Sequence, residues 1–160
     1  MNREEIKKLI QGPIALAPTP FDENFDVDYG RMADLTEYWV DSGVVTGKSV
    51  IKVAAMAGEG FKLSDTEWHH LLRTVVQAAK GKAPIMGTIH HKDTVRAIED
   101  ARKAQDLGAV ALQVSAPDFN DPTQDDMMRF FGALSDAIEI GIVLYQTHFT
   151  NNGVVYPETL

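Results

Sequence analysis

The sequence predicts an α/β fold built on parallel strands. Short apolar segments alternate along the chain with longer segments that show helical spacing, and a polar or glycine-containing loop follows each apolar segment. This alternation requires parallel strand pairing, because each helix then serves as the crossover between two strands. Parallel strands must also be covered on both faces, which agrees with their apolar composition.

The first repeating unit is a strand expected over residues 14–18 and a helix expected over residues 27–42. Gly12-Pro13 and Pro20 bound the strand, and such residues mark the loops at strand ends. The apolar residues of the helix recur at helical spacing, and Gly43 supplies a stop signal.

The second unit has the most clearly marked helix start. A strand over residues 49–55 leads through the loop 56–63 to Ser64-Asp65-Thr66-Glu67, which matches the capping-box pattern. In this motif the serine satisfies a terminal amide while the glutamate reaches back. The apolar face of the helix that follows consists of Leu71, Leu72, Val75, Val76 and Ala79.

The same pattern continues through the rest of the sequence. The expected elements are strand 84–89, helix 92–107 ending at Gly108, strand 110–115, helix 123–138 and strand 142–145. A loop follows, and Pro157-Glu158-Thr159-Leu160 has the pattern of a first helical turn, where proline and acidic residues are favourable. We therefore expect the sequence to stop within a fifth unit.

Two architectures fit this alternation. A doubly wound sheet would be complete near five strands, whereas an eightfold barrel would need three more units. No Gly-x-Gly-x-x-Gly or P-loop sequence follows any expected strand, so the main reason to choose a nucleotide-binding sheet is missing. We expect a TIM (β/α)8 barrel, with residues 1–160 forming the N-terminal portion of one domain that holds about the first five β/α units.

Composition and charge exclude several function classes. Without cysteine, the 160 residues offer no disulfide, thiolate metal site or cysteine nucleophile. A net charge of -8, with 15 scattered lysine and arginine residues, opposes binding to nucleic acid. No apolar run approaches the roughly 20 residues that span a bilayer, and the first residues are too charged for a secretory signal. We expect a cytoplasmic protein that binds neither nucleic acid nor membranes.

Chemistry is expected in the loops after the strands, because these loops converge on one face of a parallel α/β structure. They contain Thr19, the run Met56 to Glu59, the pair His90-His91, the run Pro117 to Asn120, and the run Tyr145 to His148.

Several segments carry a family resemblance. They are Gly12 to Asp22, Gly58-Glu59 with Leu63 to Trp68, Ala116-Pro117 with Asn120 to Gln124, and Leu144-Tyr145 with Tyr156 to Leu160. In order and spacing they resemble the dihydrodipicolinate synthase and N-acetylneuraminate lyase superfamily, over nearly the whole sequence. The resemblance implies a TIM barrel, usually tetrameric, in which a sixth-strand lysine forms a Schiff base with pyruvate or another 2-oxo acid. That lysine would lie beyond Leu160.

The resemblance therefore implies a lyase or aldolase-type enzyme, assembled as a homotetramer or homodimer, that needs no further cofactor. Covalent attachment turns the substrate carbonyl into an electron sink. Tyr145 matches the family tyrosine that relays protons, although an aromatic residue that only packs and hydrogen-bonds would also fit this position. The residues expected to bind or shape the acid are Thr19, Ala57, Gly58, Glu59 and His90.

Departures from the family pattern argue against dihydrodipicolinate synthase itself. Met56-Ala57 replaces a Thr-Thr pair and cannot donate a hydroxyl. Asp118-Phe119 replaces a tyrosine pair, and Thr150 replaces an arginine that binds a carboxylate. A lyase, aldolase or dehydratase with another substrate remains open. So does a noncatalytic homologue that binds a small acid or serves as a structural or regulatory subunit.

Lys52 and the histidines offer alternatives of lesser weight. Lys52 lies on the second strand, and an ordinary strand lysine is favoured over a relocated nucleophile. His90, His91 and His148 could face one cavity with Glu59, as acids, bases or metal ligands. Neighbouring strand residues point to opposite faces, so at most one of His90 and His91 is expected to line it. The irregular spacing favours ordinary loop histidines, and no metal is expected.

Overall fold

A computed structural model of the chain describes residues 3–90, 93–117, 122–146 and 155–156. The strands are β1 (Ile14–Leu16), β2 (Val50–Lys52), β3 (Ile85–Ile89), β4 (Ala111–Ser115) and β5 (Gly141–Tyr145). The α-helices are α1 (Arg3–Leu9), α2 (Tyr29–Asp41), α3 (Asp65–Ala79), α4 (Thr94–Leu107) and α5 (Gln124–Ala137). Two short 3-10 turns, η1 (Met56–Gly58) and η2 (Gly60–Lys62), lie between β2 and α3.

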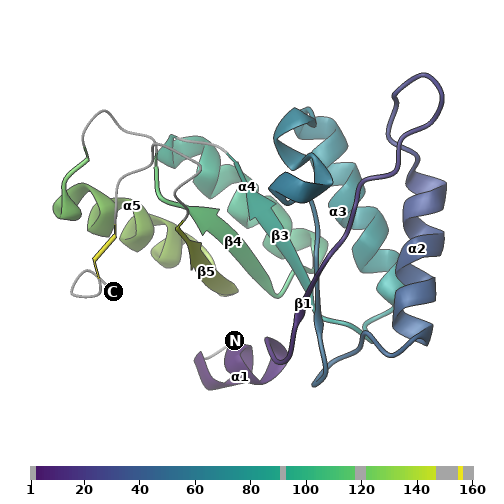
Figure 1. Ribbon diagram of the computed structural model, residues 1–160. Helices are drawn as coiled ribbons and strands as arrows, with labels where there is room; N and C mark the ends of the chain where they lie inside the picture. Colours follow the sequence, from purple (N-terminus) through teal and green to yellow (C-terminus); the bar gives the residue numbers. More distant parts are fainter. Residues whose placement is uncertain (1–2, 91–92, 118–121, 147–154, 157–160) are drawn as a thin grey trace.

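The strands form one parallel sheet in which each strand lies beside its neighbour in the sequence, in the order β1-β2-β3-β4-β5. This order decides between the two expected architectures. A doubly wound sheet reverses its strand order to place helices on both faces, whereas a barrel adds each strand on the same side of the last. The structure therefore confirms the expected partial TIM barrel, with a curved sheet and helices outside it (Figure 1).

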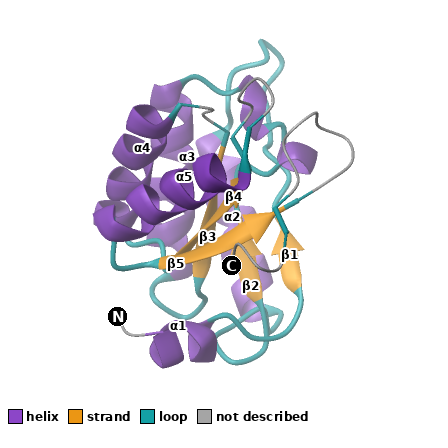
Figure 2. Ribbon diagram, turned by 90° about the vertical axis from the view of Figure 1, so that its left-hand side faces the viewer, coloured by secondary structure: helices purple, strands orange, loops and turns teal. Residues whose placement is uncertain are grey.

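Helices α2 to α5 cover the outer face of the sheet (Figure 2). Every second strand residue faces these helices, as illustrated by Ile51 of β2, Ile85 of β3 and Leu112 of β4, which are 0 to 2% exposed and share one core cluster. The helices contribute Leu71, Leu72 and Val75 of α3 to the same cluster. This core holds the β/α units in place and leaves the inner face of the sheet for other contacts.

Apolar residues, here called the apolar floor, line the inner face of the sheet near the amino-terminal ends of the strands. Val50, Met86 and Ala111 form a separate buried cluster, against which Ile10 and Val143 pack. Helix α1 lies at the amino-terminal ends of the strands, opposite the ends where the strand-to-helix loops leave (Figure 1). Helix α1 was not predicted from the sequence, because its seven residues hold only two apolar side chains, Ile6 and Leu9, which are too few to establish helical spacing.

The predicted capping box at the start of α3 is confirmed. Ser64 and Glu67 form a reciprocal capping box at α3, and Thr123 and Asp126 form another at α5. Helix α2 begins at Tyr29, two residues later than expected at residue 27, because the Asp28 side chain accepts a hydrogen bond from the Arg31 amide and caps the helix there. These caps fix the residue at which each of these strand-to-helix loops ends.

Strand β2 is shorter than the expected range 49–55. The sheet pairing stops after Lys52, and Ala54 adopts a left-handed conformation with φ 55°. This conformation is unfavourable for a residue with a β-carbon and cannot continue a strand. The helical turn expected at residues 157–160 lies outside the described residues. In the described part of the chain, no helix is long and apolar enough to cross a membrane.

Candidate functional site

The carboxyl ends of the strands bring several of the predicted residues together. The hydroxyl of Thr19, which follows β1, donates to the backbone oxygen of Gly58 in η1 at 2.6 Å. A β-carbon added at Gly58 would lie 2.5 Å from the backbone oxygen of Ala17, so only glycine allows this approach. The predicted residues Thr19 and Gly58 are therefore neighbours, and the first two loops form one unit.

The loop after β2 has a strained and tightly bonded backbone. Ala54 and Glu59 both have φ near 55°, which costs about 1 kcal/mol or more for a residue with a β-carbon. The amides of Gly58 and Glu59 donate to the backbone oxygens of Ala55 and Met56, each at 3.0 Å. Those two amides are engaged within the turns, while the side chains of Ala57 and Glu59 are exposed.

His90, at the end of β3, supports this loop from the side. Its Nε2 lies 2.6 Å from the backbone oxygen of Ala54, and a carbonyl oxygen can only accept, so Nε2 carries the hydrogen and donates. His90 is partly buried and also lies edge-on to the Phe61 ring, with centroids 6.5 Å apart. In this state Nε2 cannot serve as a base, and the clearest role of the ring is to hold the loop.

Tyr145 closes β5 beside Ser115 of β4. Its neighbour Leu144 packs against the helix-side cluster of α5, whereas Val143 packs against the inner floor, so Tyr145 points to the inner face. The side chain is 39% exposed, which leaves its phenol accessible from the carboxyl end of the sheet.

Lys52 was predicted to be an ordinary strand lysine, and the structure places it on the inner face. It is 8% exposed, and its Nζ donates to Oε1 of Gln113 on β4 at 2.5 Å. The same Nζ lies 5.8 Å from the centroid of the Tyr145 ring, within the range of a cation–π interaction. Burial lowers the pKa of Lys52, because an apolar environment disfavours the charged form.

The sequence contains a pattern that indicates this inner polar group, although the prediction for Lys52 did not draw on it. Val50 and Lys52 alternate with Ile51, and Ala111 and Gln113 alternate with Leu112, so each polar residue shares a face with an apolar floor residue. Alternation alone, however, could not tell the inner face from solvent. Only the curvature of the sheet brings Lys52, Gln113 and Tyr145 together.

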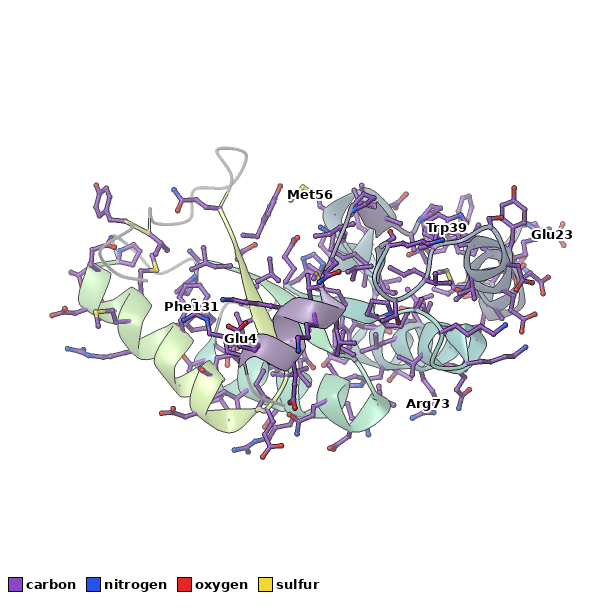
Figure 3. The ribbon with its side chains drawn as sticks, turned by 90° about the horizontal axis from the view of Figure 1, so that it is seen from below. Glu4, Glu23, Trp39, Met56, Arg73 and Phe131 are labelled. Carbon is purple, nitrogen blue, oxygen red and sulfur yellow. The ribbon has the colours of Figure 1, made fainter. Side chains whose placement is uncertain are left out.

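The expected loss of hydroxyl groups is visible in η1. Met56 and Ala57 occupy the turn, and Met56 is 50% exposed. Figure 3 shows Met56 on the opposite side of the molecule from Arg73, which lies on the outer surface of α3. Neither side chain in this part of the turn can donate a hydrogen bond or pass a proton.

Some predicted positions lie outside the described residues: His91, Asp118, Phe119, His148 and Thr150. Among the residues that are described, no group of three or more histidine, aspartate or glutamate side chains is arranged to hold a metal ion. The described site therefore consists of a phenol, a buried ammonium, a hydroxyl and a glycine-rich turn. Such groups can bind an anionic carbonyl compound and move a proton beside it.

Comparison with known proteins agrees with this geometry. A model of the dihydrodipicolinate synthetase family matches residues 9–160. The 4-hydroxy-tetrahydrodipicolinate synthase of Aromatoleum aromaticum is 34% identical over 137 residues, which cover 86% of this chain and 46% of that protein. The corresponding synthase of Thermomicrobium roseum is 30% identical over 151 residues, covering 94% of this chain and 48% of that protein.

Solved structures show the same relationship. The crystal structure of dihydrodipicolinate synthase from Cyanidioschyzon merolae with lysine bound matches with a TM-score of 0.85 and 27% identity, covering 94% of this chain and 50% of that one. An N-acetylneuraminate lyase from Mycoplasma synoviae, at 18% identity and a TM-score of 0.76, shares the fold and covers 91% of this chain and 49% of its own. The chain spans about half the length of the curated relatives it matches. With the strand order, the strand-end residues and these matches in agreement, the chain belongs to the dihydrodipicolinate synthetase family.

Proposed function

We propose that this protein is a lyase or aldolase-type enzyme that acts on a 2-oxo acid through a Schiff base. The observation that carries the proposal is the position of Tyr145, whose phenol lies on the inner face of the sheet beside the buried ammonium of Lys52. In a member of this family, a tyrosine at the end of β5 is placed to serve the chemistry of an amine and a carbonyl group.

The proposed reaction begins when a lysine amine adds to the carbonyl carbon of the 2-oxo acid. A proton is transferred to the departing oxygen, water leaves, and a C=N bond forms. Tyr145 is suited to carry that proton, because its hydroxyl can both donate and accept. The attacking lysine is proposed to lie beyond Leu160, on the sixth strand of the complete barrel. The residues proposed to shape the acid-binding end are Thr19, Ala57, Gly58, Glu59 and His90.

The substrate is proposed to differ from that of dihydrodipicolinate synthase. Met56 and Ala57 leave the turn after β2 without a hydroxyl group, and Met56 adds an exposed apolar side chain there. A relay through paired threonines therefore cannot operate in this chain. An aldol cleavage, condensation or dehydration of another 2-oxo acid needs only the Schiff base and one proton carrier.

The complete domain is proposed to be longer than residues 1–160, and the protein is proposed to form a homo-oligomer. Residues 1–160 would form the N-terminal part of a single barrel domain, in agreement with the length of the relatives. Ile14 and Leu16 of the edge strand β1 are 38% and 45% exposed. The outer edges of β1 and β5 also present backbone groups that can pair with further strands. Completion of the barrel would cover them, and a homo-oligomer is expected beyond that.

Borohydride trapping tests the proposed function. The protein in its natural length is incubated with pyruvate or with longer 2-oxo acids, reduced, and examined by intact-mass and peptide-mass measurement. A covalent adduct on a lysine that depends on the 2-oxo acid supports the Schiff base. The matching 2-hydroxy acids serve as controls, because they have no carbonyl group to attack. Absence of an adduct with every 2-oxo acid would favour a noncatalytic homologue that binds a small acid.

A further inference from the structure

A layer of buried polar residues lies on the inner face of the sheet, above the apolar floor. Lys52 of β2, Thr88 of β3 and Gln113 of β4 are 8%, 2% and 7% exposed. Each lies two residues after a floor residue of the same strand, Val50, Met86 and Ala111 respectively. Alternation along a strand therefore places the three polar side chains on one face, toward its carboxyl end.

The Lys52 ammonium has too few partners for a buried charge. Within the described residues its one hydrogen-bond acceptor is the neutral amide oxygen of Gln113, at 2.5 Å, and no carboxylate forms an ion pair with it. An ammonium has three donors, and a buried charge is costly unless an opposite charge compensates it. Apart from Gln113 and the Tyr145 ring, the ammonium of Lys52 thus has capacity to bind an anion.

Thr88 adds a second incomplete group. Its hydroxyl is buried and has no hydrogen-bond partner among the described residues. Buried hydroxyl groups are nearly always paired, so the hydroxyl of Thr88 offers an open hydrogen-bonding position on the same inner face as Lys52. Thr88 and Lys52 thus both place hydrogen-bonding capacity on the inner face that the described residues leave unused.

The closeness of Lys52 to Tyr145 favours a small anion with a carbonyl group. In a 2-oxo acid the carboxylate carbon is bonded directly to the carbonyl carbon. The group that binds the carboxylate and the group that relays a proton at the carbonyl must therefore be neighbours. Lys52 Nζ lies 5.8 Å from the centroid of the Tyr145 ring, so the two side chains are neighbours, as a ligand of this size requires.

We propose that Lys52, oriented by Gln113, binds the carboxylate of the 2-oxo acid substrate. This inference rests on the proposed function and supplies a binding group where the Met56-Ala57 turn has no side-chain donor. The bound carboxylate completes the hydrogen bonds of the ammonium and, by its charge, favours the protonated form that burial disfavours. Lys52 is a binding residue in this assignment, and the Schiff base forms on a different lysine.

Lys52→Met tests the assignment, because methionine keeps most of the length of the side chain and removes the charge. Lys52→Arg restores a cation, and Lys103→Met, on the exposed surface of α4, removes a lysine outside the site. Two measurements separate binding of the carboxylate from formation of the Schiff base. Trapping with borohydride is titrated with pyruvate and with its uncharged methyl ester, and L-lactate binding is followed by NMR because lactate cannot form an imine.

The expected result is a loss of roughly 10- to 100-fold in apparent affinity for both pyruvate and lactate in Lys52→Met, the range for a hydrogen bond to a charged group. Lys52→Arg should recover much of that loss. Lys103→Met should bind as the wild type does, and the methyl ester should be trapped equally well by all variants. Thermal unfolding confirms that each variant is folded.

Unchanged pyruvate and lactate affinity in folded Lys52→Met would overturn the inference, as would mapping of the reduced adduct to Lys52 itself. The inference and the proposed function can fail separately. Lactate binding that depends on Lys52, without any trapped 2-oxo acid, would leave the carboxylate site standing and refute the Schiff base. Conversely, trapping of pyruvate with the same apparent affinity in Lys52→Met and in the wild type would support the Schiff base and refute the carboxylate site.

Discussion

Replacing Gly60 with alanine should destabilise the loop that carries Gly58 and Glu59. A β-carbon at Gly60 would overlap the backbone oxygen of Ala54 and would lie 2.7 Å from Nε2 of His90. These two atoms are also the partners of the 2.6 Å hydrogen bond between His90 and Ala54. The added methyl group therefore collides with both ends of the contact that fixes the loop.

The size of the effect follows from what must move. The overlap with Ala54 involves backbone, which no change of side-chain rotamer can relieve, and overpacking of this kind costs about 1–3 kcal/mol. Displacement of His90 adds the loss of one hydrogen bond, about 0.5–1.5 kcal/mol. We expect the free energy of unfolding to fall by about 2–4 kcal/mol. With a urea m value of about 2 kcal/mol/M, the unfolding midpoint should fall by about 1–2 M.

Urea unfolding, followed by tryptophan fluorescence and by circular dichroism, measures this change. Gly132→Ala is the matched control, because it adds the same methyl group in helix α5 where no atom lies within 4 Å. That control should be unchanged or more stable by up to about 1 kcal/mol, since alanine favours helix. A Gly60→Ala protein as stable as the wild type would show that the loop does not require glycine there and would refute the reasoning.

Three other predictions concern the relay tyrosine, a buried hydrogen bond and a helix cap. Tyr145→Phe should slow 2-oxo acid trapping by roughly 100-fold or more while leaving stability nearly unchanged, because the ring remains and only the proton carrier is lost; trapping at the wild-type rate would exclude the relay. Trp68→Phe should cost about 1–3 kcal/mol in urea unfolding, because it removes the 2.9 Å bond from Nε1 to the buried backbone oxygen of Thr88. Trp39→Phe, which loses an indole without a described hydrogen bond, should cost less, and equal losses would contradict this account. Hydrogen bonds from Ser64 lower the pKa of Glu67, so its contribution to stability is present above the ordinary glutamate pKa and is lost as the pH falls through the lowered value. Glu67→Gln should therefore flatten the dependence of stability on pH in the acidic range, and an unaltered dependence would assign it to other groups.

The sequence allowed the β/α units to be recognised because their signals are local. The capping box at Ser64 and the glycine at 108 act on backbone groups within a few residues, and the structure confirms both boundaries. Strand β2 was predicted too long because a left-handed residue at Ala54 has no signature in an apolar run. Helix α1 was missed because seven residues with two apolar side chains are too short to establish helical spacing.

The candidate site was only partly predictable, since its residues come from different strands. Strand-end position was enough to select Thr19, Gly58 and Tyr145. It could not reveal that His90 donates to the backbone of the neighbouring loop, because that contact depends on how the end of β3 meets the segment that follows β2.

By itself, then, the sequence determined the order of strands and helices, the direction of strand pairing and the family. These depend on local spacing, on caps and on the need for crossovers. Only the tertiary structure decided which strand residues face the inside of the curved sheet, and so that Lys52 is a buried cation beside Tyr145. The physical reason is that alternation separates two faces of a strand but does not say which one the barrel encloses.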